Sequence, residues 1–258
     1  MKHWIHFPRV EGDTSRQAAA DAPPILFAAG TKNSYCPTAC LKTTEKGIKM
    51  ELHGYFRSSA SYRVRIGLNL KGLQYDYTPV NLLQGEQRGD TYRKLNPQGL
   101  VPALVDGRTV LTQSLAILEW LDEQYPEPPL LPGDPLKRAK VRALAYSVAC
   151  DIQPVQNLRV LQYLQSEYAI SDKQKIHWIQ HWIHEGFTAL EKQLDPAPFA
   201  GGDKPGLFEC CLIPQIYSAQ RFGMDISEYP AIHRIMNACS DIAAFVDARP
   251  ENQPDSTL

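Results

Sequence analysis

The sequence predicts an α/β domain followed by an all-helical domain. The chain has 258 residues, which is long for a single domain of about 100 to 200 residues. From Met50 onward its first part alternates between strand and helix patterns, whereas apolar residues recur only at helical spacing after a proline-rich connector at residues 127–135. We therefore expect the α/β domain at residues 50–131 and the helical domain at residues 136–258.

The α/β domain opens with a strand–helix–strand unit. Ser58 and Ser59 follow the first strand and are typical N-caps of a helix, and Gly72 is a typical helix stop. Pro79 favours a sheet edge or a strand end for the second strand. The predicted elements are a strand at residues 51–55, a helix at 60–71 and a strand at 75–80.

A short helix ending near Leu95, a hairpin and a longer helix complete the domain. The pair Asp106–Gly107 lies between two apolar runs, which is a strong signal for a turn that joins antiparallel strands. Gln113 and Ser114 then precede leucines at positions 115, 118 and 121, which have helical spacing. The strand–helix–strand unit is therefore followed by strand, strand and helix.

Composition and charge exclude two classes of function. The 27 basic and 28 acidic side chains give a net charge of -1, without the basic surplus that is typical of nucleic-acid-binding proteins. No stretch approaches the about 18 uninterrupted apolar residues of a membrane-spanning helix. We therefore expect neither nucleic acid nor a membrane as a partner, which leaves catalysis on a small molecule or binding of one.

The charge is unevenly distributed along the chain. Residues 1–49 carry 7 basic and 4 acidic side chains (7 − 4 = +3), whereas residues 50–258 carry 20 and 24 (20 − 24 = −4). The first stretch lacks sustained periodicity and matches neither a secretory nor a mitochondrial targeting pattern. We expect residues 1–49 to be a disordered or spurious leader, with Met50 as an alternative start.

The cysteines indicate a reducing compartment. Cys36 and Cys40 are separated by three residues, which does not fit the C-x-x-C spacing of redox and zinc motifs. The other four lie in apolar helical stretches, where a free cysteine behaves as a small hydrophobic residue: Cys150, Cys210, Cys211 and Cys239. We therefore expect a cytoplasmic protein.

Two local features are candidates for chemistry. Ser58 and Ser59 lie where a strand turns into a helix, and the unpaired N–H groups and positive dipole end there favour an anion such as a thiolate, although both serines could be caps alone. Val101–Pro102 opens a strand, where a cis bond would present the Val101 backbone to an extended peptide ligand. An ordinary loop proline is the alternative there.

Three motifs together resemble the zeta class of glutathione transferases, which includes maleylacetoacetate isomerase and bacterial maleylpyruvate isomerase. They are FRSSASYRVRI at residues 56–66, NPQGLVP at 96–102 and QSLAILE at 113–119. The resemblance runs from about Met50 to Asp255 and leaves the leader outside it. It implies a thioredoxin-like glutathione-binding domain followed by a helical domain, usually in a homodimer.

The resemblance also implies how glutathione binds. Ser58 corresponds to the hydroxyl that faces the glutathione sulfur, with Ser59 beside it. Val101 corresponds to the residue that pairs with the cysteinyl backbone, and Pro102 to the family's cis-proline.

The two ends of glutathione have counterparts as well. Gln113 and Ser114 correspond to the pair that holds the γ-glutamyl end, and Gln87 to a loop glutamine near the glycyl end.

The substrate side of the site falls in the predicted helical domain. Residues 151–161, which include Gln153, Asn157 and Arg159, are similar to a family segment that lines the pocket for an acidic substrate. Arg221 corresponds to a family arginine near the substrate carboxylate. An arginine fork can bind a carboxylate through two hydrogen bonds, whereas lysine offers a point charge.

The sequence departs from the family pattern at three positions. Ala60 stands where animal members often have cysteine, so no protein thiol is available there. Gln153 stands where several bacterial relatives, including the maleylpyruvate type, have histidine, which favours maleylacetoacetate. Gly206 replaces the usual Ser or Thr of a capping box whose acid is Glu209, and we expect a cost of about 1 kcal/mol or less.

The activity that the resemblance implies is glutathione-dependent cis–trans isomerisation of maleylacetoacetate to fumarylacetoacetate, in aromatic amino acid catabolism. The expected substrate is therefore a small anionic maleyl compound. Maleylpyruvate isomerisation and glutathione transfer to small α-haloacids are alternatives. A glutathione transferase fold retained only as a binding module is a further alternative, because a fold does not fix a function.

Three histidines on one predicted helix face are a competing signal. His177, His181 and His184 have the spacing of zinc ligands. They alternate with Trp178 and Trp182, and no H-E-x-x-H pattern is present, so we expect an amphipathic helix and no metal.

Overall fold

The computed structural model describes residues 49–258, which belong to one compact unit. The predicted leader, apart from Lys49, lies outside the described residues, and so do Cys36 and Cys40. Among the described residues, no helix combines the length and the apolar character that crossing a bilayer requires.

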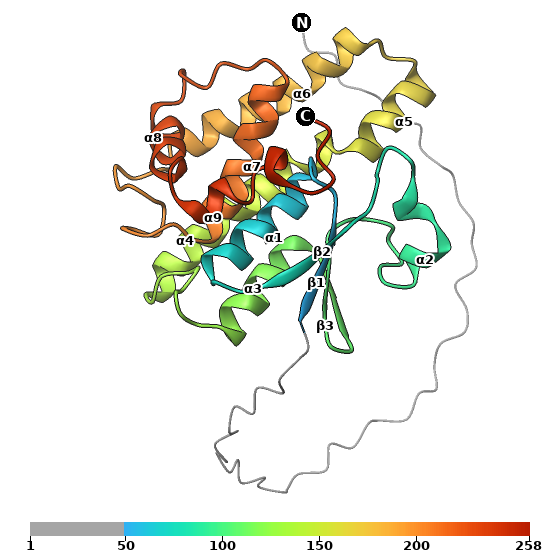
Figure 1. Cartoon of the computed structure of the whole chain (residues 1–258). Helices are drawn as coiled ribbons and strands as arrows, with labels where there is room; N and C mark the ends of the chain where they lie inside the picture. The colour runs from blue at the N-terminus through green and yellow to red at the C-terminus, as the bar shows by residue number, and fades with distance from the viewer. Residues whose placement is uncertain (1–48) are drawn as a thin grey trace, which may run out of the picture. The chain divides into compact units, whose positions relative to one another are not determined.

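A four-stranded mixed sheet forms the centre of the α/β part, with strand order β2-β1-β3-β4 (Figure 1). β1 (Met50–Gly54) runs parallel to β2 (Tyr75–Pro79). β3 (Ala103–Asp106) is antiparallel both to β1 and to β4 (Thr109–Thr112). Gly107, with a φ of 61°, lies in the turn between β3 and β4, which confirms the predicted hairpin.

Two helices pack together against this sheet. They are α1 (Ser59–Leu70) and α3 (Ser114–Gln124). A Cβ atom on Gly67 of α1 would lie 2.1 Å from Cδ2 of Leu118 in α3, so this close approach requires glycine. The apolar core below the helices contains Met50, Leu52, Val64, Leu68, Leu104, Ile117 and Leu121.

The connection from β2 to β3 holds the predicted short helix as two pieces. These are η1 (Glu86–Arg88) and α2 (Asp90–Arg93). Tyr92 is buried under this connection and donates a hydrogen bond from its hydroxyl to the Leu100 carbonyl at 2.7 Å.

The rest of the described chain is helical, as the sequence predicts. Its elements are α4 (Pro135–Tyr146), a π-helical continuation η2 (Ser147–Ile152), η3 (Pro154–Gln156), α5 (Leu158–Tyr168), α6 (Asp172–Glu191), α7 (Leu207–Arg221), α8 (Pro230–Cys239), α9 (Ala243–Val246) and η4 (Pro250–Asn252). α1 packs against α7 and α9, and one apolar core extends from Tyr62 and Ile66 of α1 into the helical part. The domain boundary predicted between residues 131 and 136 falls in the connection from α3 to α4 and stays a prediction.

Gly206 has a structural role that the sequence analysis does not anticipate. A Cβ atom there would lie 2.2 Å from the Leu130 carbonyl oxygen, which also accepts the Leu207 N–H at 2.8 Å. The Glu209 carboxylate accepts the N–H groups of Gly206 and Ala200, each at 2.8 Å. The helix start is therefore stabilised by Glu209, and glycine is a steric requirement.

Candidate active site

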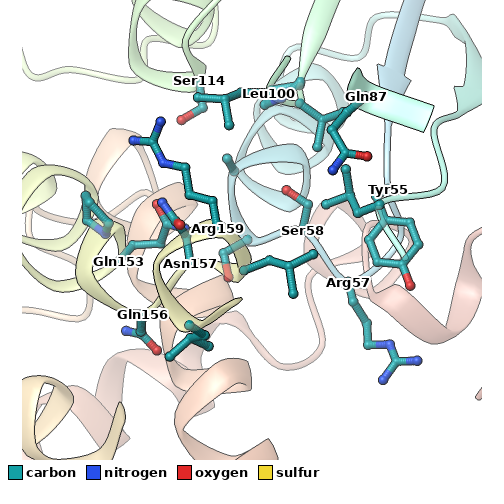
Figure 2. Close-up of a pocket in the computed structure, with 18 of the residues that line it drawn as sticks. Tyr55, Arg57, Ser58, Gln87, Leu100, Ser114, Gln153, Gln156, Asn157 and Arg159 are labelled. Atoms are coloured by element: carbon teal, nitrogen blue, oxygen red, sulfur yellow. The ribbon is translucent and has the colours of Figure 1, made fainter. Parts of the chain in front are cut away.

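A cavity of about 580 Å³ lies between the α/β part and the helical part. The structure brings all eleven site residues predicted from the sequence to its wall: Ser58, Ser59, Gln87, Val101, Pro102, Gln113, Ser114, Gln153, Asn157, Arg159 and Arg221. Figure 2 shows Ser58 facing a wall that carries Gln153, Asn157 and Arg159. These residues come from six separate segments of the chain, which the fold brings together at one cavity.

Ser58 is both an N-cap and a cavity residue. Its Oγ accepts the Ser61 N–H at 3.2 Å, and its φ and ψ of −69° and 117° are extended, as is usual for a cap that precedes α1. A hydroxyl that accepts one hydrogen bond still has its own hydrogen to donate. Capping and donation to a ligand are therefore compatible at Ser58.

Ser114 begins α3 on another side of the cavity. Its Oγ accepts a hydrogen bond from Nη1 of the buried Arg63 at 3.3 Å. Gln113, just before it, has a φ of 68°, a conformation that is unfavourable for a residue with a side chain and that is often found at functional sites. Gln113 also donates from Nε2 to Gln98 Oε1 at 2.8 Å.

The loop before β3 forms a third side. The Val101–Pro102 peptide bond is cis. Asn96, only 2% exposed, donates from Nδ2 to the Leu100 carbonyl at 2.7 Å, which fixes the loop. Gln87 is 7% exposed, and its Oε1 has no hydrogen-bond partner among the described residues.

The helical wall holds the remaining predicted residues. Asn157 is the N-cap of α5 and accepts the Val160 N–H at 3.2 Å, so α5 begins at the cavity, as α1 and α3 do. Arg159 lies in the first turn of α5, and Arg221 is the last residue of α7. Three helix N-termini therefore meet at one cavity, and each favours negative charge.

The side chains of the cavity reinforce this preference. Seven basic residues and no acidic residue line it, as far as the described chain shows: Arg57, Arg63, Arg88, Arg93, Arg159, Lys175 and Arg221. Burial, and then the nearby charge of Arg57, hold the pKa of Arg221 below its usual value. Within residues 49–258, none of the six arginines is in an ion pair with a carboxylate. The cavity is thus suited to ligands with several negative charges.

Five of these basic residues were missed by the sequence analysis as site residues. Arg57 offered a signal, because it directly precedes Ser58 in the motif at residues 56–66. Arg88 donates to Gln162 of α5 at 3.0 Å, a contact that only the fold creates. Arg63, Arg93 and Lys175 also come to the cavity only through the tertiary arrangement.

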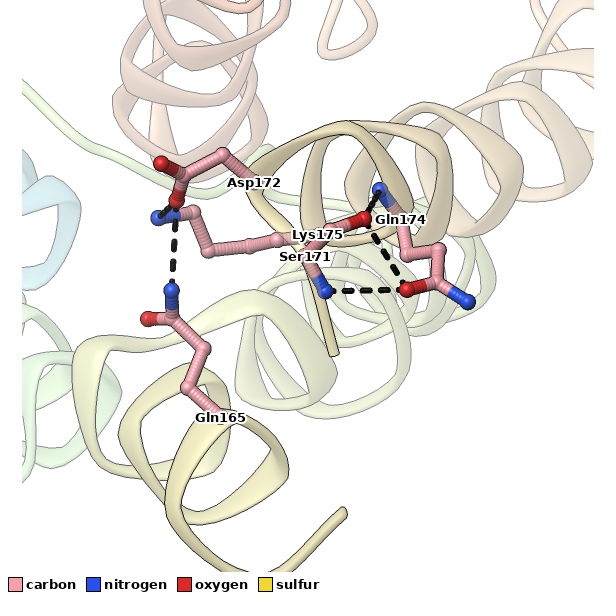
Figure 3. A network of polar contacts seen from close by, with 5 residues as sticks. All are labelled: Gln165, Ser171, Asp172, Gln174 and Lys175. Atoms are coloured by element: carbon pink, nitrogen blue, oxygen red, sulfur yellow. Dashed lines mark hydrogen bonds and ion pairs between the residues drawn. The ribbon is translucent and has the colours of Figure 1, made fainter. Parts of the chain in front are cut away.

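Lys175 is held at the start of α6 by the polar network in Figure 3. It pairs with Asp172 at 2.6 Å, and Gln165 of α5 donates to the same carboxylate at 3.2 Å. Ser171 and Gln174 form a capping box that fixes this helix start. The network ties α5 to α6 at the wall that carries Gln165 and Lys175.

The three histidines lie on α6 and do not line this cavity. His184 Nδ1 is 2.6 Å from the Tyr229 hydroxyl. Over residues 49–258, no group of three or more His, Cys, Asp or Glu residues is arranged to hold a metal ion.

Comparison with known proteins agrees with the geometry. Residues 57–124 match the family model for the glutathione S-transferase N-terminal domain. A zeta-class glutathione S-transferase of Euphorbia esula is 48% identical over 212 residues, which cover 81% of this chain and 93% of the relative. The chain belongs to the zeta class of glutathione transferases.

Solved structures extend the similarity to three dimensions. The holo structure of a maleylpyruvate isomerase, described as a bacterial glutathione transferase of the zeta class, has a TM-score of 0.78 and 46% identity, covering 80% of this chain and 99% of that one. A maleylacetoacetate isomerase from Anaeromyxobacter dehalogenans with bound glutathione has a TM-score of 0.74 and 44% identity, covering 81% and 99%. The predicted thioredoxin-like and helical fold is therefore confirmed.

Proposed function

We propose that this zeta-class protein is a glutathione-dependent cis–trans isomerase that converts maleylacetoacetate into fumarylacetoacetate. The observation that carries the proposal is a cavity in which Ser58 faces Arg159 and which Arg57 and Arg221 also line. Within the described residues none of these three arginines is in an ion pair with a carboxylate. The similar proteins with solved structures support both the activity and the use of glutathione.

The described residues fit glutathione, a peptide with two carboxylates and one thiol. Gln113, Ser114 and the N-terminus of α3 bind the γ-glutamyl end, and the Val101 backbone pairs with the cysteinyl residue. The unpartnered side-chain oxygen of Gln87 is available for a donor near the glycyl end. Neutral and basic groups alone surround this volume within the described chain, which suits a ligand of negative charge.

Ser58 activates the thiol in this proposal. Its hydroxyl accepts from Ser61 N–H and donates to the sulfur, with Ser59 at the first position of α1. Donation to the sulfur and the positive end of the α1 dipole both stabilise the thiolate over the thiol. When bound, glutathione supplies the thiolate that adds reversibly to the cis double bond and so permits rotation about it.

Arg159 and Arg221 hold the carboxylates of the maleyl substrate, and Arg57 lies beside Arg221 as a third cation. Each guanidinium can form two parallel hydrogen bonds to a carboxylate. The same charges offset the negative charge that develops on the substrate during addition. Gln153 and Asn157 border the substrate on the helical wall.

Maleylpyruvate is the second candidate substrate, favoured by the similarity to the maleylpyruvate isomerase structure. Gln153, in place of the histidine of several bacterial relatives, favours maleylacetoacetate. The test is a coupled assay of the full chain with each substrate, with and without glutathione. We expect turnover only when glutathione is present, and a higher kcat/KM for maleylacetoacetate than for maleylpyruvate. Equal turnover with and without glutathione would contradict the proposal.

The same proposal includes a cytoplasmic homodimer. The four cysteines of the described residues are free thiols, which suits a reducing compartment. Light scattering of the purified chain measures the mass of the assembly, and a monomer mass at assay concentration would contradict the dimer.

A further inference from the structure

The C-terminal segment reaches back to the turn that carries Ser58. Oδ2 of Asp255 accepts the Phe56 N–H at 3.0 Å, across 199 residues of sequence, and lies 3.5 Å from the Tyr77 hydroxyl. Figure 1 shows this last segment beside the start of α1. The backbone that leads into Ser58 is therefore held by a residue from the far end of the chain.

Arg65 binds the other backbone polar group of Phe56, its carbonyl oxygen. Its Nη2 donates to the Phe56 carbonyl at 2.9 Å, and its Nε donates to the Ala248 carbonyl at 3.0 Å. The Arg65 side chain is 0% exposed, so water does not compete for these bonds. Asp255 and Arg65 together fix both backbone groups of Phe56 to the C-terminal part of the chain.

Side-chain hydrogen bonds to the backbone hold the C-terminal segment around residues 246–253. Gln253 is 9% exposed and donates from Nε2 to the carbonyls of Asp247 and Arg249, both at 2.9 Å. Asn252 donates from Nδ2 to the Val246 carbonyl at 2.7 Å. These bonds hold the chain that presents the Asp255 carboxylate.

The turn that receives these contacts carries three cavity residues, Tyr55, Arg57 and Ser58. Ser58 N–H donates to the Tyr55 carbonyl at 2.9 Å, which closes the turn, and Phe56 within it is 1% exposed. Arg57 and Ser58 follow directly and both line the cavity. A shift of Phe56 would change the direction of both side chains.

We propose that Asp255 is a positioning residue, which holds the turn at residues 55–58 so that Ser58 and Arg57 project correctly into the cavity. Asp255 does not line the cavity and acts on it through the backbone of Phe56. The inference rests on the proposed function, because the direction of the Ser58 hydroxyl matters for catalysis only if that hydroxyl binds the thiol.

The test compares three variants of the full chain. Asp255→Ala removes the acceptor, whereas Asp255→Asn keeps a side-chain oxygen that can accept the Phe56 N–H. Glu251→Ala is the matched control, since it removes an exposed carboxylate of the same segment that has no hydrogen bond to the turn. We measure kcat, the two KM values, the pKa of the bound glutathione thiol from its thiolate absorbance, and hydrogen exchange at the Arg57 and Ser58 amides.

We expect Asp255→Ala to lower kcat about tenfold or more, as loss of a charge-assisted hydrogen bond can do. The bound thiol pKa should rise and the two amides should exchange faster, while Asp255→Asn recovers most of the loss and Glu251→Ala matches the wild type. Wild-type kcat and exchange in Asp255→Ala would overturn the inference, as would equal losses in Asp255→Ala and Asp255→Asn. If the wild type isomerises neither maleyl compound, the proposed function fails, and the exchange data still decide whether Asp255 holds the turn.

Discussion

Replacing Gly206 by serine tests whether N-cap preference or steric contact with Leu130 decides the stability of the α7 start. Serine is a better N-cap than glycine and is the residue type usual for the family at this position, so the sequence alone predicts a small gain in stability. In the structure the position faces the Leu130 carbonyl, and the Glu209 carboxylate already accepts the Gly206 N–H. We therefore predict a loss of stability.

The size of the loss follows from the contacts. The new Cβ would lie 2.2 Å from the Leu130 oxygen and 3.0 Å from its carbonyl carbon. Overpacking of this kind costs about 1–3 kcal/mol. Moving Leu130 away also weakens its hydrogen bond with Leu207 N–H, which is worth about 1 kcal/mol. The better cap returns only about a few tenths of a kcal/mol, so we expect Gly206→Ser to lower the free energy of unfolding by about 2–4 kcal/mol.

Urea unfolding measures this difference as a lower midpoint at unchanged slope. Gly133→Ser is the matched control, because no atom lies within 4 Å of a Cβ placed on Gly133, and we expect it to unfold like the wild type. A Gly206→Ser variant that is as stable as the wild type, or more stable, would refute the steric account of the α7 start.

Three further predictions concern the charges and thiols. Arg221→Gln should raise the substrate KM about tenfold or more and leave the glutathione KM unchanged, because a charged hydrogen bond to the substrate is lost. Steady-state kinetics measure both KM values, and equal rises would contradict substrate binding by Arg221. Burial raises the pKa of Glu209, so its stabilising contribution is present at low pH and falls as pH rises above the ordinary value of 4.5. The stability difference between wild type and Glu209→Gln, from urea unfolding at several pH values, should therefore decline with rising pH, and a constant difference contradicts this. Cys150→Ser should remove one fast-reacting thiol at neutral pH, because Cys150 is exposed whereas burial raises the pKa of Cys211 to about 11. A thiol titration whose fast phase is unchanged in this variant would contradict the prediction.

Local sequence patterns predict much of the fold. The Asp106–Gly107 pair predicts a hairpin because glycine adopts positive φ readily, and the turn is present with Gly107 at 61°. The apolar spacing at residues 115, 118 and 121 predicts α3, and both Leu118 and Leu121 are fully buried. These features depend on neighbours in sequence, so the sequence alone could reveal them.

Features that depend on tertiary contacts could not be predicted in this way. Gln113 has a positive φ that its residue type does not signal. For Gly206 the sequence predicts only a weaker cap, because the contact with Leu130, which lies 76 residues earlier in the chain (206 − 130), is created by the fold. The gathering of seven basic side chains around one cavity, in a segment of net negative charge, likewise follows only from the fold.

The roles of the predicted site residues depend above all on Ser58. The most direct measurement is the pKa of the thiol of bound glutathione in the wild type and in Ser58→Ala, read from thiolate absorbance as pH is varied. In the wild type we predict a thiol pKa at least about one unit below the free value of about 8.5. In Ser58→Ala we predict a rise of this pKa toward the free value and a turnover that is lower by at least about tenfold. An unchanged thiol pKa and turnover in Ser58→Ala would contradict the assignment of Ser58 as the activating hydroxyl.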